Sequence, residues 1–287
     1  MRVNPQRARK FWQEHKHNSW LFFILLVVVT LLLSAVGVRF LKPPAVISLL
    51  ISVTLVQTLI FLNSGRIVIL LMGCQPPDAQ QQARLQPILN RLVEKSGLSY
   101  MPALFIAAME VPNAFAFGTG LMGGSGIAVT KPILEILDDR ELGSVLAHEL
   151  GHIVSRDTAL MTMISITLTV LNNMTRGMSN IGRLALVGGL LIEVIAYFPR
   201  VIAAGITQLR EYAADAYSAY LTEDVEPMIS AFKKMRTWHE TNEPKRKKTL
   251  LDHLQRNRMD ELLLSHPDMS KRINMLNQLR EENHESV

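Results

Sequence analysis

The stretch VLAHELGHIVSRD, residues 145–157, carries two histidines four positions apart, with a glutamate directly after the first. On an α-helix, side chains four residues apart lie on one face about one turn from each other, so His148 and His152 can bind the same ion. Glu149 points about 100° away, beside the ion, where a general base for an activated water must lie. The spacing predicts a metal site with a base next to it. A buried helix that carries two histidines by chance is the alternative.

The motif lies on a predicted helix. Asp138 can serve as the N-cap, and Glu141 three residues later completes a capping-box pattern. The run at 141–155 then offers apolar side chains for burial, namely Leu142, Val145, Leu146 and Ile153. Asp157 either lies close to the metal ligands or only marks the end of the helix, and it is not among the predicted catalytic residues.

Two long apolar segments precede the motif. Residues 18–38 and 43–65 contain no charged side chain and no histidine, and each exceeds the roughly 20 helical residues that span a bilayer core. Only RFLK, residues 39–42, joins them. A buried soluble helix or a cleaved signal peptide fits less well, because a second span follows after so short a loop. The segments predict a transmembrane helical hairpin.

Basic residues predict the orientation of this hairpin. The first 17 residues contain five lysines or arginines, whereas the connecting loop contains two, and the positive-inside rule therefore places the N-terminus in the cytoplasm. Two spans return the chain to the same side, so the site is expected to face the cytoplasm. The apolar stretches at 158–175 and 184–199 are compatible with spans, a re-entrant pair or buried core.

The region between the hairpin and the motif predicts a helix followed by a small sheet. Residues 83–98 have apolar positions at helical spacing, and Gly97 marks the predicted end of the helix. Three short strand-like runs follow around glycine-rich connections, at 101–111, 114–120 and 124–130, and predict an antiparallel sheet. An edge strand with open backbone groups would suit an extended peptide. An ordinary loop with weak strand character is an equally good reading.

Cysteine content and charge exclude several classes of site. Cys74 is the only cysteine, so neither an intramolecular disulfide nor a cysteine-based zinc cluster can form. The formal net charge is +5, and the run PKRKK lies at 244–248. No nucleic-acid-binding module accompanies this run, so it is expected to be solvated or to face lipid.

A later segment offers a third metal ligand. Catalytic zinc is held by three protein ligands with one open position. The run QLREYAADAYSAYL, residues 208–221, contains Glu211 with Asp215 one helical turn further on. Glu211 could complete a His-His-Glu set, and Asp215 could accept the other ring N–H of a ligating histidine. Either carboxylate could instead be a surface charge.

With these segments, the chain resembles the membrane-embedded zinc metallopeptidases that include the HtpX-type heat-shock proteases and, more distantly, the CAAX prenyl endopeptidases. The resemblance rests on PNAFAFGTG with IAVT (112–130), LAHELGHIVSRD (146–157), REYAAD (210–215) and SHP with KR (265–272). It implies one zinc ion per chain, bound by His148, His152 and Glu211, with Glu149 as the general base.

The resemblance also implies further site residues, and the sequence departs from the family pattern at two places. His266 is the candidate stabiliser of the oxyanion, with Arg272 supporting that region, whereas a loop histidine made rigid by Pro267 is the alternative. Phe117 intervenes before Gly118, and the linker LMGGSG is unusually rich in glycine. These departures put the detail of the substrate-binding strand in doubt, not the metal site.

The expected fold is α+β and mainly helical. A transmembrane helical hairpin precedes a gluzincin metallopeptidase domain that has a small antiparallel sheet and is interrupted by two further hydrophobic helices. The expected segments are a basic cytoplasmic tail (1–17), the hairpin (18–74), a first peptidase part (78–157), the hydrophobic pair (158–206) and a second peptidase part (207–287) with the third ligand, the His-Pro motif and C-terminal helices.

The expected function is hydrolysis of peptide bonds in misfolded or damaged membrane proteins, as part of protein quality control. An edge strand reads the backbone of any extended chain, so loose selectivity is expected. The partners are then unfolded substrates and the lipid bilayer, without nucleic acid, in a multi-pass protein of the bacterial inner membrane. A CAAX-type processing peptidase and a catalytically silent adaptor with structural zinc are the alternatives. The oligomeric state is left open.

Overall fold

The computed structural model describes residues 3, 5–15, 62–119, 124–156, 158, 208–242 and 269–281, and single positions between 44 and 59. Most of the two predicted spans, nearly all of the hydrophobic pair at 158–206 and the SHP motif lie outside the described residues. Within the described part of the chain, no helix is both long and apolar enough to cross a membrane.

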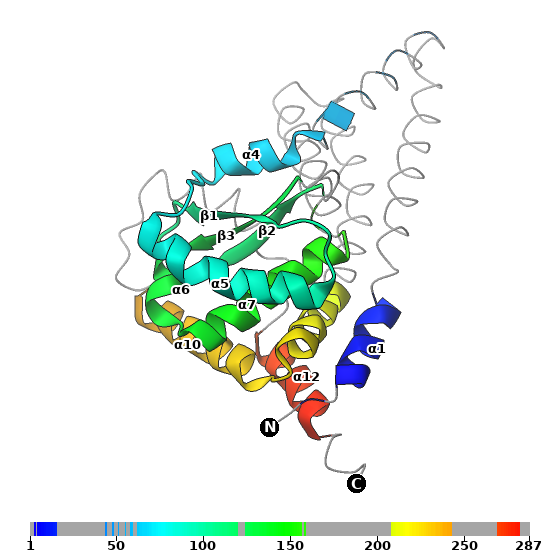
Figure 1. Cartoon of the computed structure of the whole chain (residues 1–287), viewed down its shortest axis with the longest axis vertical. Coiled ribbons are helices and arrows are strands. Elements are labelled where there is room, and N and C mark those ends of the chain that lie inside the picture. The colour runs from blue at the N-terminus through cyan, green and yellow to red at the C-terminus, as the bar shows by residue number, and fades with distance from the viewer. Residues whose placement is uncertain are drawn as a thin grey trace, which may run out of the picture. The chain divides into compact units, whose positions relative to one another are not determined.

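The chain divides into two compact units. One comprises Met1–Lys16, Ser64–Ala159 and Thr207–Val287, and the other comprises His17–Asn63 and Leu160–Ile206. The predicted metal-site residues all belong to the first unit. This unit is mainly helical and includes a three-stranded sheet (Figure 1).

The elements of the first unit follow one another along three stretches of chain. They are α1 (Pro5–His15), α4 (Ser64–Leu71), α5 (Ala79–Ser96), β1 (Ala103–Ala107), β2 (Ala114–Gly118), β3 (Ser125–Thr130), α6 (Lys131–Ile136), α7 (Asp139–Val154), a helix at 208–222, α10 (Glu226–Asn242) and α12 (Met269–Glu281).

The sheet is mixed, in the order β1-β3-β2. Strand β3 pairs antiparallel with β2 and parallel with β1. The prediction of an antiparallel sheet is therefore wrong for one of the two pairings. The physical reason is that β3 inserts between the two earlier strands, and three short apolar runs do not encode which of them become neighbours. Among the described strands, β2 lies at an edge.

The helix before the sheet confirms the sequence prediction. Asp78 caps α5, and its capping box with Gln81 is complete. The helix ends at Gly97, which adopts a left-handed conformation with φ of 70°, a conformation that costs glycine little. Leu85, Ile88, Leu89, Leu92 and Val93 form its buried face.

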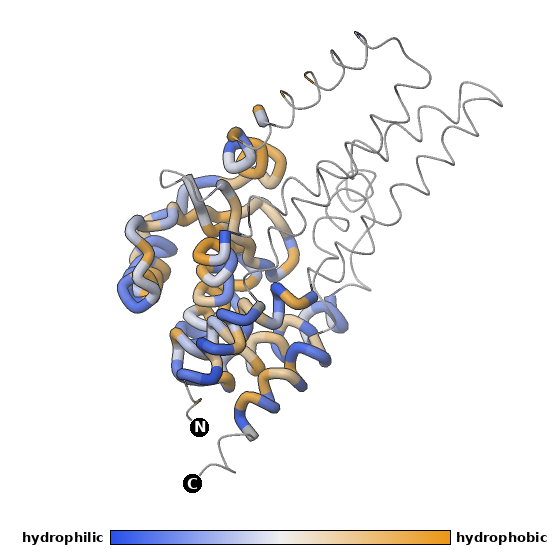
Figure 2. The backbone as a smooth tube through the Cα atoms, turned by 90° about the vertical axis from the view of Figure 1, so that its right-hand side faces the viewer, coloured by the Kyte–Doolittle hydropathy of each residue, from blue (hydrophilic) through white to orange (hydrophobic). Residues whose placement is uncertain are grey.

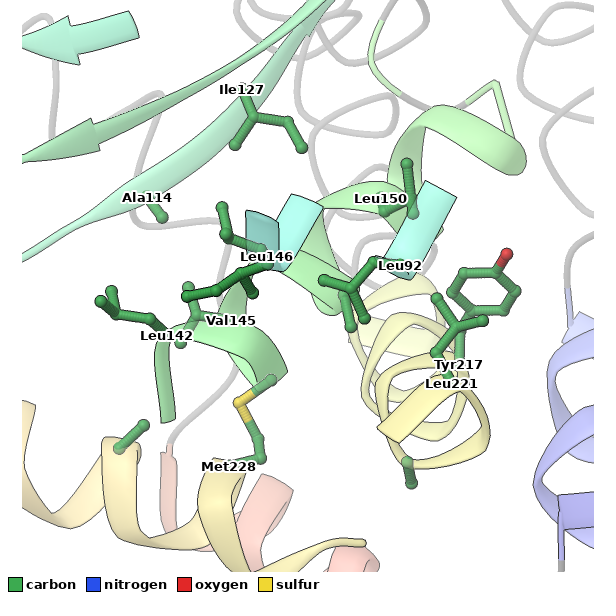
Figure 3. Close-up of a cluster of buried hydrophobic side chains, with 14 of the residues drawn as sticks. Leu92, Ala114, Ile127, Leu142, Val145, Leu146, Leu150, Tyr217, Leu221 and Met228 are labelled. Atoms are coloured by element: carbon green, nitrogen blue, oxygen red, sulfur yellow. The ribbon is translucent and has the colours of Figure 1, made fainter. Parts of the chain in front are cut away.

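Helix α7, which carries the motif, is buried along most of its length. The Asp138 side chain accepts hydrogen bonds from the backbone N–H groups of Arg140 and Glu141, and the Glu141 side chain accepts one from the backbone N–H of Asp138. The predicted capping box is therefore present. The four apolar residues predicted for burial are all buried, and Figure 3 shows three of them, Leu142, Val145 and Leu146, within the core cluster.

Other elements converge on the same cluster around α7. The labelled side chains come from α5 (Leu92), β2 (Ala114), β3 (Ile127), the helix at 208–222 (Tyr217 and Leu221) and α10 (Met228) (Figure 3). The core therefore fixes α7 against both the sheet and the helix that carries the predicted third ligand.

A smaller apolar cluster lies under α4. Val68, Ile69 and Met72 pack against buried residues that include Phe117 and Ala128. Figure 2 colours much of α4 as hydrophobic, and Leu70 and Leu71 on this helix are exposed.

Phe117 accounts for the departure from the family pattern. It pairs with Gly126 across β2 and β3, and a Cβ atom at Gly126 would lie 2.5 Å from Cζ of Phe117. The ring therefore covers Gly126, the last residue of the glycine-rich linker, and the missing Cβ there provides space for the ring.

Candidate metal centre

Three side chains from two helices converge on one point. His148 and His152 come from α7, and Glu211 comes from the helix at 208–222. The Nε2 atoms of the two histidines lie 3.2 Å apart. Oε2 of Glu211 lies 3.4 Å from Nε2 of His148, and Oε1 lies 3.3 Å from Nε2 of His152.

These separations fit a tetrahedral zinc ion. Two bonds of about 2.0–2.1 Å at a tetrahedral angle place their ligand atoms about 3.3 Å apart. The two Nε2 atoms, and each Nε2 atom with one of the two carboxylate oxygens of Glu211, are separated by distances within 0.1 Å of that value. The two imidazoles and one carboxylate are also the donor set of a catalytic site that keeps a position for water. The residues present therefore fit the metal that the sequence predicts.

The two ligand helices can meet at this distance because Gly151 lies between them. A Cβ atom at Gly151 would lie 3.1 Å from Cδ1 of Tyr217 and 3.4 Å from Cα of Ala214. Oγ of Ser218 also donates to the carbonyl oxygen of Ser144 at 2.7 Å. The small residues of HELGH and REYAAD thus have a packing role in addition to the motif.

Asp215 contacts His148 at Nδ1, the ring nitrogen that does not face the shared centre. Its Oδ1 lies 2.8 Å from Nδ1 of His148. Nη2 of Arg272 is further from the same nitrogen, at 3.2 Å, so we assign the proton to Nδ1 and the bond to Asp215. This tautomer leaves the lone pair of Nε2 directed at the shared centre.

Arg272, on α12, stabilises the carboxylate form of Asp215. Its Nε and Nη2 donate to the two carboxylate oxygens at 2.8 and 2.6 Å, and its guanidinium lies 4.4 Å from the ring centroid of Phe232. Burial raises the pKa of Asp215, but the charge and hydrogen bonds of Arg272 outweigh burial and hold that pKa below its ordinary value. Nη1 of Arg272 also lies 3.1 Å from Oε2 of Glu211.

The environment of His148 favours its protonated form when no metal is bound. Burial and the positive charge of Arg272 lower the pKa of His148, whereas hydrogen bonds to Asp215 and Glu211 raise it, and the net shift is upward. A cation at this position is therefore favoured electrostatically.

Glu149 faces the sheet. The side chain is buried, and its Oε2 accepts a hydrogen bond from the backbone N–H of Ala116 in β2 at 2.7 Å. The predicted base is thus fixed to the edge strand.

Alternate residues of β2 direct their backbone groups away from β3. Thr130 N–H donates to the carbonyl of Asn113, so the antiparallel pattern directs the backbone groups of Ala114, Ala116 and Gly118 away from β3. At this edge, Thr158 donates through Oγ1 to the carbonyl of Gly118 at 2.6 Å.

Some site residues lie beyond what the structure describes, and some features were not predicted. His266 and Asp157 lie outside the described residues. The bond between Glu149 and Ala116, and the packing of α1 on the peptidase unit, were missed by sequence reasoning. The signal for α1 was available, because Val3, Ala8, Phe11 and Trp12 are apolar residues in a segment that is mainly polar and charged.

Comparison with known families agrees with this geometry. Residues 79–280 match peptidase family M48. The chain belongs to this family and is a zinc metallopeptidase with an HExxH-plus-glutamate metal site.

The individual relatives are proteases as well. The protease HtpX homolog of Caldanaerobacter subterraneus is 28% identical over 250 residues, which cover 79% of this chain and 83% of that protein. The protease HtpX homolog of Acidiphilium cryptum is 30% identical, with coverage of 73% and 78%. That of Aquifex aeolicus is also 30% identical, with coverage of 75% and 78%. The chain is therefore similar to HtpX-type proteases along most of its length.

Proposed function

We propose that this protease is a multi-pass endopeptidase of the bacterial inner membrane, with one zinc ion per chain and its site on the cytoplasmic side. Its substrates are unfolded or damaged membrane proteins. The observation that carries the proposal is the convergence of three side chains from two helices, in which each histidine Nε2 lies 3.3 or 3.4 Å from an oxygen of Glu211 and 3.2 Å from the other Nε2. Next to them, Glu149 is bonded to the edge strand β2.

The chemistry follows from the residues around the centre. Zinc held by His148, His152 and Glu211 would polarise the scissile carbonyl and lower the pKa of a water toward about 7. Glu149 accepts the proton of the attacking water and delivers it to the departing amine. Asp215 holds the imidazole of His148 in the tautomer that binds metal.

His266 is the proposed second stabiliser of the oxyanion. A tetrahedral intermediate needs a donor at the oxygen where charge develops, and the SHP motif supplies a histidine followed by a rigid proline. A His266→Ala variant is expected to keep its zinc and to lose about 10²- to 10³-fold in kcat. Loss of zinc from this variant would instead assign His266 to the metal.

The edge of β2 supports the class of substrate. An extended peptide that adds to this edge is held through its backbone. The N–H of Ala116 is bonded to Glu149, so such a peptide would replace that bond and leave the base beside it. Such recognition discriminates little among side chains. Unfolded chains are therefore the expected substrates, and damaged membrane proteins are those nearest to a membrane-anchored site.

Packing of the N-terminal segment supports the orientation. Helix α1 precedes the first predicted span and belongs to the same compact unit as the metal site. A segment that packs on the peptidase unit has to lie on the same side of the bilayer. A reporter fused at about residue 85 is expected to lie in the cytoplasm, and a periplasmic signal would overturn this orientation.

A Glu149→Gln variant tests the enzyme directly. Purified full-length protein in detergent is expected to carry about one zinc per chain and to cleave unfolded casein and an unfolded membrane protein. Glutamine keeps the shape of the side chain but cannot accept a proton, so cleavage should fall by about 10²- to 10⁴-fold while zinc content stays unchanged. Glu94→Gln, an exposed change on α5, is the matched control.

Other outcomes would assign another function. Cleavage confined to prenylated peptides would indicate a CAAX-type processing enzyme. A wild-type protein that carries zinc and cleaves no unfolded substrate would favour an adaptor.

A further inference from the structure

Helix α1 and Val3, which precedes it, pack on the peptidase unit through three buried side chains. Val3, Ala8 and Trp12 belong to the main core cluster. The backbone N–H of Val3 donates to the carbonyl of Glu223 at 3.4 Å, and the guanidinium of Arg9 lies 6.0 Å from the ring centroid of Tyr220. The segment expected to be a tail is thus anchored to the domain.

Trp12 contacts both helices that carry metal ligands. Its indole Nε1 donates to Oγ of Ser155 at 3.0 Å. Ser155 is the C-cap of α7, three residues after His152. The ring of Trp12 lies 4.8 Å from that of Tyr217, centroid to centroid, at 46°. Tyr217 belongs to the helix that carries Glu211, and Figure 3 shows it on the side of the core nearest the ribbon of α1.

These contacts lie where the two ligand helices cross. Tyr217 is also the side chain that packs against Gly151 of α7. The bond from Ser218 to Ser144 joins the helices on the N-terminal side of the metal ligands, and Trp12 joins them on the C-terminal side. On α7, the ligands His148 and His152 lie between Ser144 and Ser155. On the other helix, Tyr217 and Ser218 both lie after Glu211, so the contacts fix that helix on the C-terminal side of its ligand.

We infer that Trp12 is a positioning residue for the metal centre. By bonding to Ser155 and packing on Tyr217, it holds α7 and the helix at 208–222 at the separation that the three ligands need. The two helices are far apart in sequence, so tertiary contacts must set this separation. Displacement of reacting groups by about 1 Å can cost about 10²-fold in rate.

The inference links the membrane anchor to the site. Helix α1 ends just before the first predicted span, so the residues that lead into the membrane are those that brace the metal centre. This link rests on the proposed function, whereas the role of Trp12 rests on the contacts of the described residues.

A double-mutant cycle tests the inference in the full-length protein. Trp12→Phe keeps an aromatic ring on Tyr217 and removes the indole donor, and Ser155→Ala removes the acceptor. Each change is expected to weaken zinc binding, measured by chelator competition, by about 2- to 10-fold, the equivalent of one hydrogen bond. Because both changes break the same bond, the double variant should be no weaker than the single variants.

Two further readouts separate positioning from general stability. The visible absorption of the cobalt-substituted protein should change in Trp12→Phe, and kcat should fall while KM stays constant. Trp238→Phe is the matched control, since Trp238 lies on α10, where its indole contacts His239. The control should leave zinc affinity, the cobalt spectrum and kcat unchanged.

Defined results would overturn the inference. If the two changes add independently, or if Trp12→Phe lowers only the melting temperature, α1 packs on the domain without positioning the ligands. Wild-type protein without zinc would contradict the proposed function itself, whereas zinc-loaded wild type with unaffected Trp12 and Ser155 variants would contradict only this inference.

Discussion

Buried carboxylates lie at both ends of α7, Glu141 near its start and Glu211 with Asp215 beside its second half, and they differ in what their oxygens contact. Near the start of α7, Glu141 is 3% exposed. Its oxygens accept hydrogen bonds from Asp138 N–H, Ser230 and Lys234 at 2.8, 2.6 and 2.7 Å. Beside the second half of α7, Glu211 from the helix at 208–222 faces the ring nitrogens of His148 and His152 around a shared centre.

The difference shows that burial of a charge does not identify a site. Glu141 has its own donors from a helix end and from α10, so it fastens these elements together. The ligand atoms at the other end are arranged toward a common point, where positive charge is favourable. Arg272 contributes one such charge, 3.1 Å from Oε2 of Glu211. The following variants are expected to separate these two kinds of buried carboxylate.

The largest effect is expected from loss of a ligand. Glu211→Ala, like His148→Ala or His152→Ala, should remove most of the bound zinc, because two protein ligands do not hold a catalytic ion. Metal analysis of the purified protein measures this directly. Full zinc occupancy in Glu211→Ala would show that the third ligand lies elsewhere in the chain.

A smaller effect on the same centre is expected from Asp215→Asn. The amide can still lie beside Nδ1 of His148, but it loses the charge that fixes the tautomer, so zinc affinity should fall about 10- to 100-fold. Chelator competition gives the affinity. Asp139→Asn, an exposed change at the start of α7, is the control and should bind zinc like the wild type. Equal affinities of Asp215→Asn and the wild type would exclude a positioning role for Asp215.

The opposite pattern is expected from Glu141→Gln. Removing this carboxylate weakens bonds to Ser230 and Lys234 and should lower the free energy of unfolding by about 1–3 kcal/mol. The loss is moderate because the Lys234 side chain is 43% exposed and can turn to water. Thermal melting measures the loss, and zinc content should stay at the wild-type value. Loss of zinc from Glu141→Gln without a lower melting temperature would show that Glu141 acts on the metal centre, as Glu211 does.

The smallest effect is expected from the N-cap of α7 and depends on pH. Hydrogen bonds from the backbone of Glu141 and Arg140 lower the pKa of Asp138, although burial opposes them. A lowered pKa stabilises the folded state at neutral pH, and this contribution disappears as the pH falls through the lowered pKa of the folded state. Asp138→Asn keeps the capping oxygen but does not ionise, so the melting temperatures of the variant and the wild type should converge on acidification. A constant difference would assign the stabilisation to another group.

Local features of this protein could be predicted because they depend on neighbours in sequence. The spacing of His148 and His152 follows from the period of an α-helix, and the capping box at Asp138 and the stop at Gly97 follow from backbone geometry. The approach of Glu211 to the histidines was predicted as one of two possibilities. The donor set favoured it, and the sequence alone could not exclude a surface carboxylate.

The remaining features were decided by tertiary structure. Insertion of β3 between β1 and β2, the bond from Ala116 to Glu149, and the contacts of Trp12 with Ser155 and Tyr217 join residues that are distant in sequence. The periodicity of apolar residues shows which face of a helix or strand will be buried, but it does not specify which other helix or strand packs against that face. The sequence by itself therefore determined the ligands on one helix. Packing of the core decided which strand lies at the edge, how the helix that carries Glu211 meets α7 and what braces the two helices together.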